Sequence, residues 1–194
     1  MSLKRCFIFM AFLQKEGKMN QVKKTVLAGL LLAIGMVLPF VTGQIPQIGS
    51  MLLPMHIPVL LCGFICGWKY GLVAGITAPL LRSLTLSMPP IFPTATCMAF
   101  ELAAYGALAG LLYNLLPKKK LNIYVSLLSA MIIGRIIWGL AMLICLNING
   151  GAFTFTAFLS GAIINALPGI IIQIILIPIL IMALENVKVL NMKN

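Results

Sequence analysis

The chain has 194 residues, of which 61% are hydrophobic and 9% are charged, and its mean hydropathy is +1.10. Soluble domains carry about 25% charged residues, and a folded chain of this size cannot hide so many apolar side chains from water. The composition therefore excludes a soluble protein and indicates one with several membrane-spanning helices. The sequence contains no Asp and no Gly-x-x-x-x-Gly-Lys-Ser/Thr motif, so aspartate-based chemistry and a nucleotide-binding phosphate loop are excluded as well.

The net charge of +11 comes from 14 Lys and Arg residues against 3 acidic residues. The basic residues occur singly or in one short cluster between apolar runs, and they do not form the continuous basic surface of a nucleic-acid-binding protein. Nucleic acid is therefore not an expected partner. The 5 cysteines show no zinc or redox spacing, and we expect them to pack as small hydrophobic residues. No bound metal or other cofactor is predicted for this chain.

The first 18 residues combine a basic start with a short apolar stretch, but no small-x-small cleavage site follows them. A second methionine, Met19, opens the run Met-Asn-Gln-Val-Lys-Lys, which is a more usual start for a membrane protein. We interpret residues 1–18 as an uninformative extension from a misassigned start. Residues 19–194 are expected to form a single domain.

Six apolar segments follow, and at about 20 residues per membrane-spanning helix each is predicted to cross the bilayer. They cover residues 25–41, 51–67, 70–86, 93–116, 121–146 and 155–184. The predicted fold class is therefore an all-α membrane protein with six transmembrane helices.

Lysines lie at alternate connections between these segments. They precede the first segment, separate the second from the third and the fourth from the fifth, and follow the sixth: Lys23, Lys24, Lys69, Lys118, Lys119, Lys120, Lys188 and Lys193. The other three loops, 43–50, 87–92 and 147–154, contain no charged residue. Because Lys and Arg favour the cytoplasmic side, both termini are predicted to be cytoplasmic in a multi-pass protein of the cell membrane.

Ionisable side chains inside apolar segments are costly, and they are therefore candidates for function. Four occur here, His56, Arg82, Glu101 and Arg135, and the predicted topology places them with Asn165 in the outer half of the membrane. These five residues lie on five different segments, so we predict a ligand pocket that opens outward. Helical spacing adds Thr94 and Tyr105 to the face that carries Glu101, and Trp138 to the face that carries Arg135.

Two arginines against one glutamate leave one positive charge unmatched, which favours an anionic ligand. Arginine suits a carboxylate in particular, because its planar fork binds both oxygens. Two structural alternatives stay open. Glu101 could form an ion pair with Arg82 or Arg135 that serves only the fold, and Arg82 could extend to the outer surface.

The remaining candidates have structural alternatives as well. His56 could cap a helix or pack in a loop, and Tyr105 and Trp138 could be packing residues. Asn165 could bond a carbonyl that is exposed by Pro168.

Small residues four positions apart let helix backbones approach closely. Such pairs occur at Gly63 and Gly67, Gly71 and Gly75, and Gly106 and Gly110, where we predict packing within the bundle. Gly29 and Ala33 form a similar pair on the first segment, which carries no polar pocket residue, so this face is predicted to receive another subunit.

Taken together, the chain resembles the substrate-binding S component of an energy-coupling-factor (ECF) vitamin transporter. The resemblance lies in six spans within one short chain, cytoplasmic termini, the small-residue pair on the first span and the outer-half pocket. Residues 52–67 followed by Lys69-Tyr-Gly-Leu, and the run Pro89-Pro-Ile-Phe-Pro93, are also similar to these proteins.

The resemblance implies a function and partners. An S component binds a water-soluble vitamin or precursor from outside and then topples against a transmembrane coupling subunit. Two ATPase subunits use the ATP, so this chain binds none. The family's usual first-span motif, Ala-x-x-x-Ala, contacts the coupling subunit, and Gly29-x-x-x-Ala33 takes its place here. The unmatched arginine favours a carboxylate such as nicotinate or pantothenate, while riboflavin, pyridoxine and thiamine-type ligands remain alternatives.

Other classes of function fit less well. A membrane hydrolase or transferase needs a nucleophile with a base, or a carboxylate–metal cluster, and one His with one intramembrane Glu supplies neither. We therefore predict that the protein is not an enzyme. The alternative that we keep is a stand-alone small-molecule permease or channel, although the sequence lacks the internal repeat typical of secondary transporters.

Overall fold

The computed structural model describes residues 20–41, 51–117, 119–148, 158, 160–161 and 165–186. The extension 1–18 and most of the predicted loops 43–50 and 147–154 lie outside these residues. Within the described part every regular element is a helix. The elements are α2 (Gln21–Val41), α4 (His56–Cys66), α5 (Trp68–Leu86), a π-helical turn η1 (Ile91–Ala95), α6 (Thr96–Leu115), α7 (Lys120–Ile148) and α9 (Leu167–Asn186).

Four described stretches are long and apolar enough to cross a membrane: Gln21–Phe40, Ile91–Leu115, Lys120–Asn147 and Leu167–Leu184. α4 is apolar but has only 11 residues, and α5 is less apolar because it carries Lys69 and Arg82. The prediction of an all-helical membrane protein is confirmed at this level.

Two predicted boundaries differ from the structure for local reasons. The segment predicted at 51–67 is broken after Met51 and Leu52, which are helical, and α4 begins only at His56, because Leu53 has a left-handed backbone (φ 49°) and precedes Pro54. The segment predicted at 155–184 is interrupted, since residues 158 and 160–161 are helical but a turn at Asn165 and Ala166 precedes α9, which starts at Leu167. Pro168 lies in the first turn of α9, where a proline is tolerated because the N–H groups have no acceptor within the helix.

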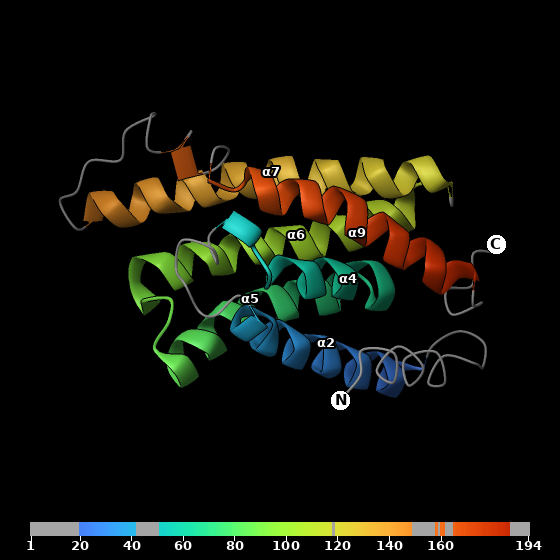
Figure 1. The fold of residues 1–194 in the computed structure, drawn as a ribbon, viewed down its shortest axis with the longest axis horizontal. Coiled ribbons are helices and arrows are strands. Elements are labelled where there is room, and N and C mark those ends of the chain that lie inside the picture. The colour runs from blue at the N-terminus through green and yellow to red at the C-terminus, as the bar shows by residue number, and fades with distance from the viewer. Residues whose placement is uncertain are drawn as a thin grey trace.

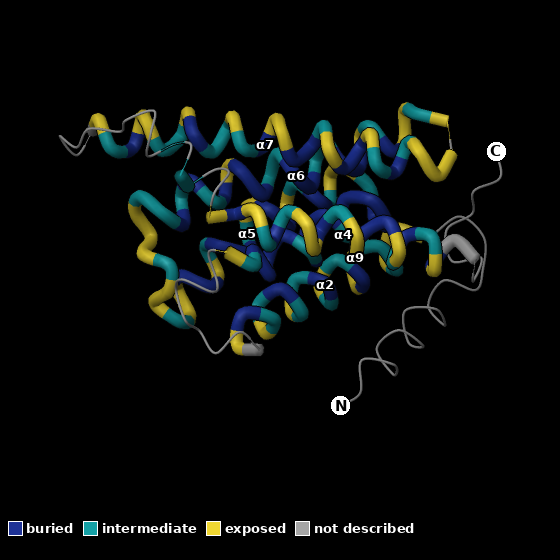
Figure 2. Tube along the Cα trace, turned by 45° about the horizontal axis from the view of Figure 1, so that its top comes forward, coloured by how far each residue is buried: buried dark blue, intermediate teal, exposed yellow. Residues whose placement is uncertain are grey.

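The helices run side by side along one axis, with α2 on one side of the bundle and α7 and α9 on the other (Figure 1). α6 packs against α4, α5 and α7, and α4 also packs against α2, α5 and α9. Buried positions concentrate on α4 and α6, whereas α2 and α7 keep exposed faces (Figure 2). The interior of the bundle is therefore centred on α4 and α6.

Glycines make the close approach of α4, α5 and α6 possible. A Cβ atom added to Gly63 or Gly71 would overlap the main-chain oxygen of Gly106, and one added to Gly75 would overlap that of Leu102. A Cβ atom at Gly110 would lie 2.5 Å from the main-chain oxygen of Gly63. The predicted packing role of these small residues within the bundle is confirmed. Gly67 has a different role, because its φ of 101° allows the tight turn between α4 and α5.

Basic residues gather at one end of the bundle. The start of α2, the start of α7 and the end of α9 lie at the same end (Figure 1). The start of α5 lies there as well, since the Tyr70 hydroxyl donates a hydrogen bond to the main-chain oxygen of Gln21 at 3.4 Å. Lys24 on α2 and Lys69 on α5 are thereby brought to one end, as the charge pattern of the loops predicts.

Candidate functional site

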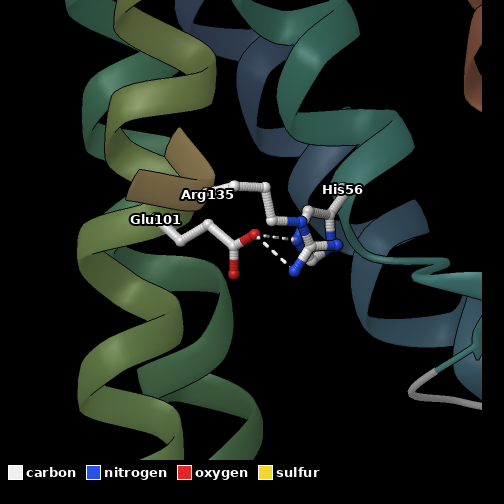
Figure 3. Close-up of polar contacts among 3 residues, drawn as sticks. All are labelled: His56, Glu101 and Arg135. Atoms are coloured by element: carbon white, nitrogen blue, oxygen red, sulfur yellow. Dashed lines mark ion pairs between the residues drawn. The ribbon is translucent and has the colours of Figure 1, made fainter. Parts of the chain in front are cut away.

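Four side chains from three helices form a polar cluster inside the bundle: His56 of α4, Glu101 and Tyr105 of α6, and Arg135 of α7. Arg135 Nη1 lies 3.0 Å from Glu101 Oε1, and His56 Nε2 lies 3.5 Å from the same oxygen (Figure 3). The Tyr105 ring meets the His56 ring edge to face, with 5.2 Å between centroids. The structure thus brings together four of the residues that the sequence singled out.

Local backbone features place each member of this cluster. Glu101 and Tyr105 are four residues apart on α6, so they share one face of that helix. His56 is the first residue of α4 and follows directly on the turn at Leu53. Gly134 precedes Arg135 on α7, and a Cβ atom there would overlap the Tyr105 ring. A glycine at position 134 therefore allows α7 to approach α6 closely enough for Arg135 to reach Glu101.

The Glu101 carboxylate is the electrostatic centre of the cluster. Glu101 is only 1% exposed, and an isolated carboxylate so far from water would be strongly unfavourable. Arg135 supplies a full opposite charge at ion-pair distance, and His56 supplies a second nitrogen. Removing one partner from such a pair costs far more than the pair contributes to stability, so Glu101 and Arg135 depend on each other.

Several donors in the cluster have no hydrogen-bond partner among the described residues. They include Arg135 Nε and Nη2 and His56 Nδ1, all of which are buried. Nε and Nη2 form one edge of the guanidinium, and two parallel N–H groups on such an edge match the two oxygens of a carboxylate. Glu101 thus engages Nη1 and leaves the two-donor edge of Arg135 available.

Arg82 does not join the polar cluster. Its side chain is buried on α5, where Nη1 donates a hydrogen bond to the main-chain oxygen of Met36 on α2 at 3.1 Å. Its guanidinium also lies 5.7 Å from the centre of the Phe40 ring. Arg82 therefore links α5 to α2, and of the two predicted ion-pair partners for Glu101 the structure selects Arg135. The second arginine therefore contacts a neutral carbonyl and an aromatic ring outside the cluster, and the cluster itself holds one arginine and one glutamate.

The other three predicted pocket residues lie on α7, on η1 and in the turn before α9. Trp138, one turn beyond Arg135 on α7, stacks on Phe158 with 6.4 Å between ring centroids and an interplanar angle of 28°. Thr94 is half-buried in η1. Asn165 is exposed in the turn before α9, and its main-chain N–H donates to the oxygen of Ser160 at 2.9 Å. Neither Thr94 nor Asn165 forms a described hydrogen bond to the polar cluster.

Sequence reasoning overlooked two buried polar residues. Ser126 on α7 and Gln173 on α9 are fully buried, and their side chains have no hydrogen-bond partner within the described ranges. Gln173 is an uncharged residue within the apolar run Ile-Ile-Ile-Gln-Ile-Ile-Leu. A single amide side chain within such an apolar run is the sequence feature that could have identified Gln173 as a buried polar residue.

Apolar helices long enough to span a bilayer, with a buried charged cluster between them, define a multi-pass membrane protein with an internal polar site. The sequence profile of one family, described as "ECF transporter, substrate-specific component", matches residues 23–181. The chain therefore belongs to the substrate-specific (S) components of ECF transporters, as its resemblance to them predicted. This is a family of transporter components and not of enzymes. No curated protein sequence and no solved structure matches the chain.

Proposed function

We propose that this S component binds a small water-soluble vitamin or precursor with a carboxylate group, such as nicotinate or pantothenate, and delivers it for ATP-driven uptake. The observation that carries the proposal is the available Nε/Nη2 edge of Arg135 inside the bundle. The charge count that first favoured an anion no longer supports it, since Arg82 is satisfied elsewhere. The ligand class now rests on the geometry of Arg135 alone.

Glu101 orients Arg135 for the proposed ligand. By holding Nη1 at 3.0 Å it fixes the plane of the guanidinium before any ligand arrives, and such preorganisation lowers the cost of binding. A ligand carboxylate would accept two charge-assisted hydrogen bonds from Nε and Nη2. His56 Nδ1 would offer a further polar contact to the rest of the ligand.

The proposed topology is that of six crossings in the cell membrane, with both termini in the cytoplasm and the polar cluster in the outer half. Two features support it. Lysines gather at one end of the bundle, which the preference of basic residues assigns to the cytoplasm. Glu101 and His56 lie near the starts of α6 and α4, in the part of each helix remote from that end. A site at this depth would receive its ligand from outside.

The proposed coupling surface is the face of α2 that carries Gly29 and Ala33. Both residues are exposed, and nothing described lies within 4 Å of a Cβ atom built on Gly29. A smooth face of small residues allows a helix of another subunit to approach closely. The partners that we propose are a transmembrane coupling subunit and two ATPase subunits, which would bind and hydrolyse the ATP.

A thermal-shift measurement on the purified protein tests the ligand. A ligand that binds only the folded state stabilises it by about 4 kcal/mol at roughly 1,000 times its Kd, so tight binding is easily seen across a panel of vitamins and precursors. Stabilisation by nicotinate or pantothenate, and not by their uncharged amides or alcohols, is the expected result. Preference for a neutral or cationic vitamin would overturn the carboxylate assignment. Uptake into vesicles without any ATPase would instead favour a stand-alone permease.

A further inference from the structure

A cavity of about 440 Å³ lies at the lysine-bearing end of the bundle. Residues of α2, the turn between α4 and α5, and the end of α6 line it, among them Gln21, Lys24, Trp68, Lys69, Tyr70 and Asn114. Cys66 also lines the cavity and is ten residues from His56 along α4, so about 15 Å separates the cavity from the polar cluster. This cavity is therefore distinct from the proposed vitamin site.

Two lysine charges converge on this cavity without a counter-ion. Lys24 comes from α2 and Lys69 from α5, and neither forms an ion pair within the described part of the chain. Glu101 is the one carboxylate whose side chain is described, and it is paired with Arg135 in the polar cluster. The charge of the cavity is consequently left for an external anion.

The remaining groups suit a phosphate at the surface of a membrane. The amides of Gln21 and Asn114 can donate hydrogen bonds, and the N-terminus of α5, which has no side-chain cap, faces the same region. Trp68 is 41% exposed and has the Lys69 ammonium 5.6 Å from the centre of its ring. Tryptophan is enriched where a bilayer meets water, so its position places the cavity at headgroup depth.

An apolar surface continues from the cavity along the helices. Val73 lines the cavity and is 57% exposed, and Ile76 and Val26 are exposed on α5 and α2. A free phosphate would use only the basic end of this arrangement, whereas a phospholipid would use both the basic end and the apolar surface. We propose that the cavity binds the phosphodiester headgroup of an anionic phospholipid of the cytoplasmic leaflet, with Lys24 and Lys69 as its two cationic contacts. The bound lipid would bridge α2 and α5.

The two tryptophans of the chain make a direct test possible. In a Trp138→Phe background Trp68 is the sole tryptophan, and brominated acyl chains bound beside it quench its fluorescence. The protein is reconstituted in phosphatidylcholine vesicles that contain increasing fractions of brominated phosphatidylglycerol. We expect preferential quenching by phosphatidylglycerol. An attraction of about 1 kcal/mol for each lysine that contacts the bound headgroup corresponds to roughly fivefold in binding, so Lys24→Gln with Lys69→Gln should lower this preference by about 25-fold.

A matched variant controls for general electrostatics. Lys119→Gln with Lys120→Gln removes the same charge from exposed positions at the start of α7 that do not line the cavity, and we expect a change of less than about twofold. Equal losses in the two double variants, or equal quenching by phosphatidylglycerol and phosphatidylcholine, would overturn the proposal. Relief of quenching by millimolar inorganic phosphate would identify free phosphate as the ligand and overturn the lipid assignment. If the double variant is not recovered folded, Lys69→Gln alone tests the expected fivefold loss.

Discussion

Arg135 and Glu101 form an ion pair in which one nitrogen of the guanidinium does all the pairing. Nη1 lies 3.0 Å from Glu101 Oε1, while Nε and Nη2 have no hydrogen-bond partner among the described residues. The pair joins α6 to α7 and at the same time orients the free edge of Arg135. Its contribution to the fold and its proposed contribution to binding therefore involve different atoms, and they can be separated by substitution.

Arg135→Lys should separate the two contributions. Lysine keeps a positive charge within reach of Glu101 but has no planar two-donor edge. We expect the affinity for the carboxylate ligand to fall by about 10- to 100-fold, since hydrogen bonds to charged groups contribute about 1.5–3 kcal/mol. Isothermal titration of the purified variant measures the affinity, and its thermal midpoint without ligand should stay close to that of the wild type. Arg82→Lys is the matched control, and an equal loss of affinity there would place Arg82 in the site.

Glu101→Gln should destabilise the protein through the charge that it leaves behind. Glutamine has nearly the same shape, but Arg135 then keeps a buried positive charge without a partner, a situation that costs about 3–5 kcal/mol. The double variant Glu101→Gln with Arg135→Gln removes both charges and should recover part of that loss. Denaturation midpoints of the two single variants and the double variant give the coupling energy. Additive effects would show that the two side chains do not interact in the folded protein.

Two glycines on different helices should respond oppositely to alanine. At Gly134 the added methyl group would overlap the Tyr105 ring, whereas at Gly29 nothing described lies within 4 Å. Gly134→Ala should therefore lower the free energy of unfolding by about 1–3 kcal/mol through overpacking. Gly29→Ala should raise it by about 0.5–1 kcal/mol through improved helix propensity. Thermal midpoints in one detergent measure both, and the same sign for both would contradict the packing described here.

The principle that located the polar cluster is the cost of ionisable groups in apolar segments. His56, Glu101 and Arg135 stood out in the sequence because each interrupts such a segment, and Tyr105 followed from its helical spacing to Glu101. Arg82 satisfied the same criterion but is bonded to the main-chain oxygen of Met36. Every residue has a main-chain carbonyl, so a hydrogen bond to one on a neighbouring helix cannot be recognised from residue types. The sequence therefore could not distinguish the two arginines.

The boundaries of the elements show a similar limit. Composition located the helices that are flanked by charges, such as α7, predicted at 121–146 and observed at Lys120–Ile148. It did not predict the turn at Asn165 and Ala166 before α9, because apolar residues continue on both sides of this turn without a charge to mark it. It also missed Gln173, whose burial depends on how α9 is turned toward the interior. Packing determines which face of a helix turns toward the interior, and the average hydropathy of a segment cannot predict that face.

Gly29→Leu should impair uptake while leaving ligand binding intact. The leucine side chain would project from the exposed face of α2 into space where the described residues leave room, so the fold and the polar cluster should tolerate it. The same side chain would hold back a helix of the coupling subunit that needs close approach to small residues. Ligand affinity should change by less than about twofold, and uptake by the reconstituted complex should fall at least tenfold in cells or vesicles supplied with ATP.

Ala183→Leu is the matched control for that experiment, because it adds bulk at an exposed small residue of α9, on a different helix. We expect its uptake to remain near that of the wild type. Full uptake by Gly29→Leu would show that this face of α2 is not the coupling surface. Equal inhibition by both variants would show that any added side chain on the surface of the bundle impairs uptake. Selective inhibition by Gly29→Leu, with co-purification of the coupling subunit reduced in parallel, would assign the defect to assembly, because the polar cluster proposed as the vitamin site lies on α4, α6 and α7 and not on α2.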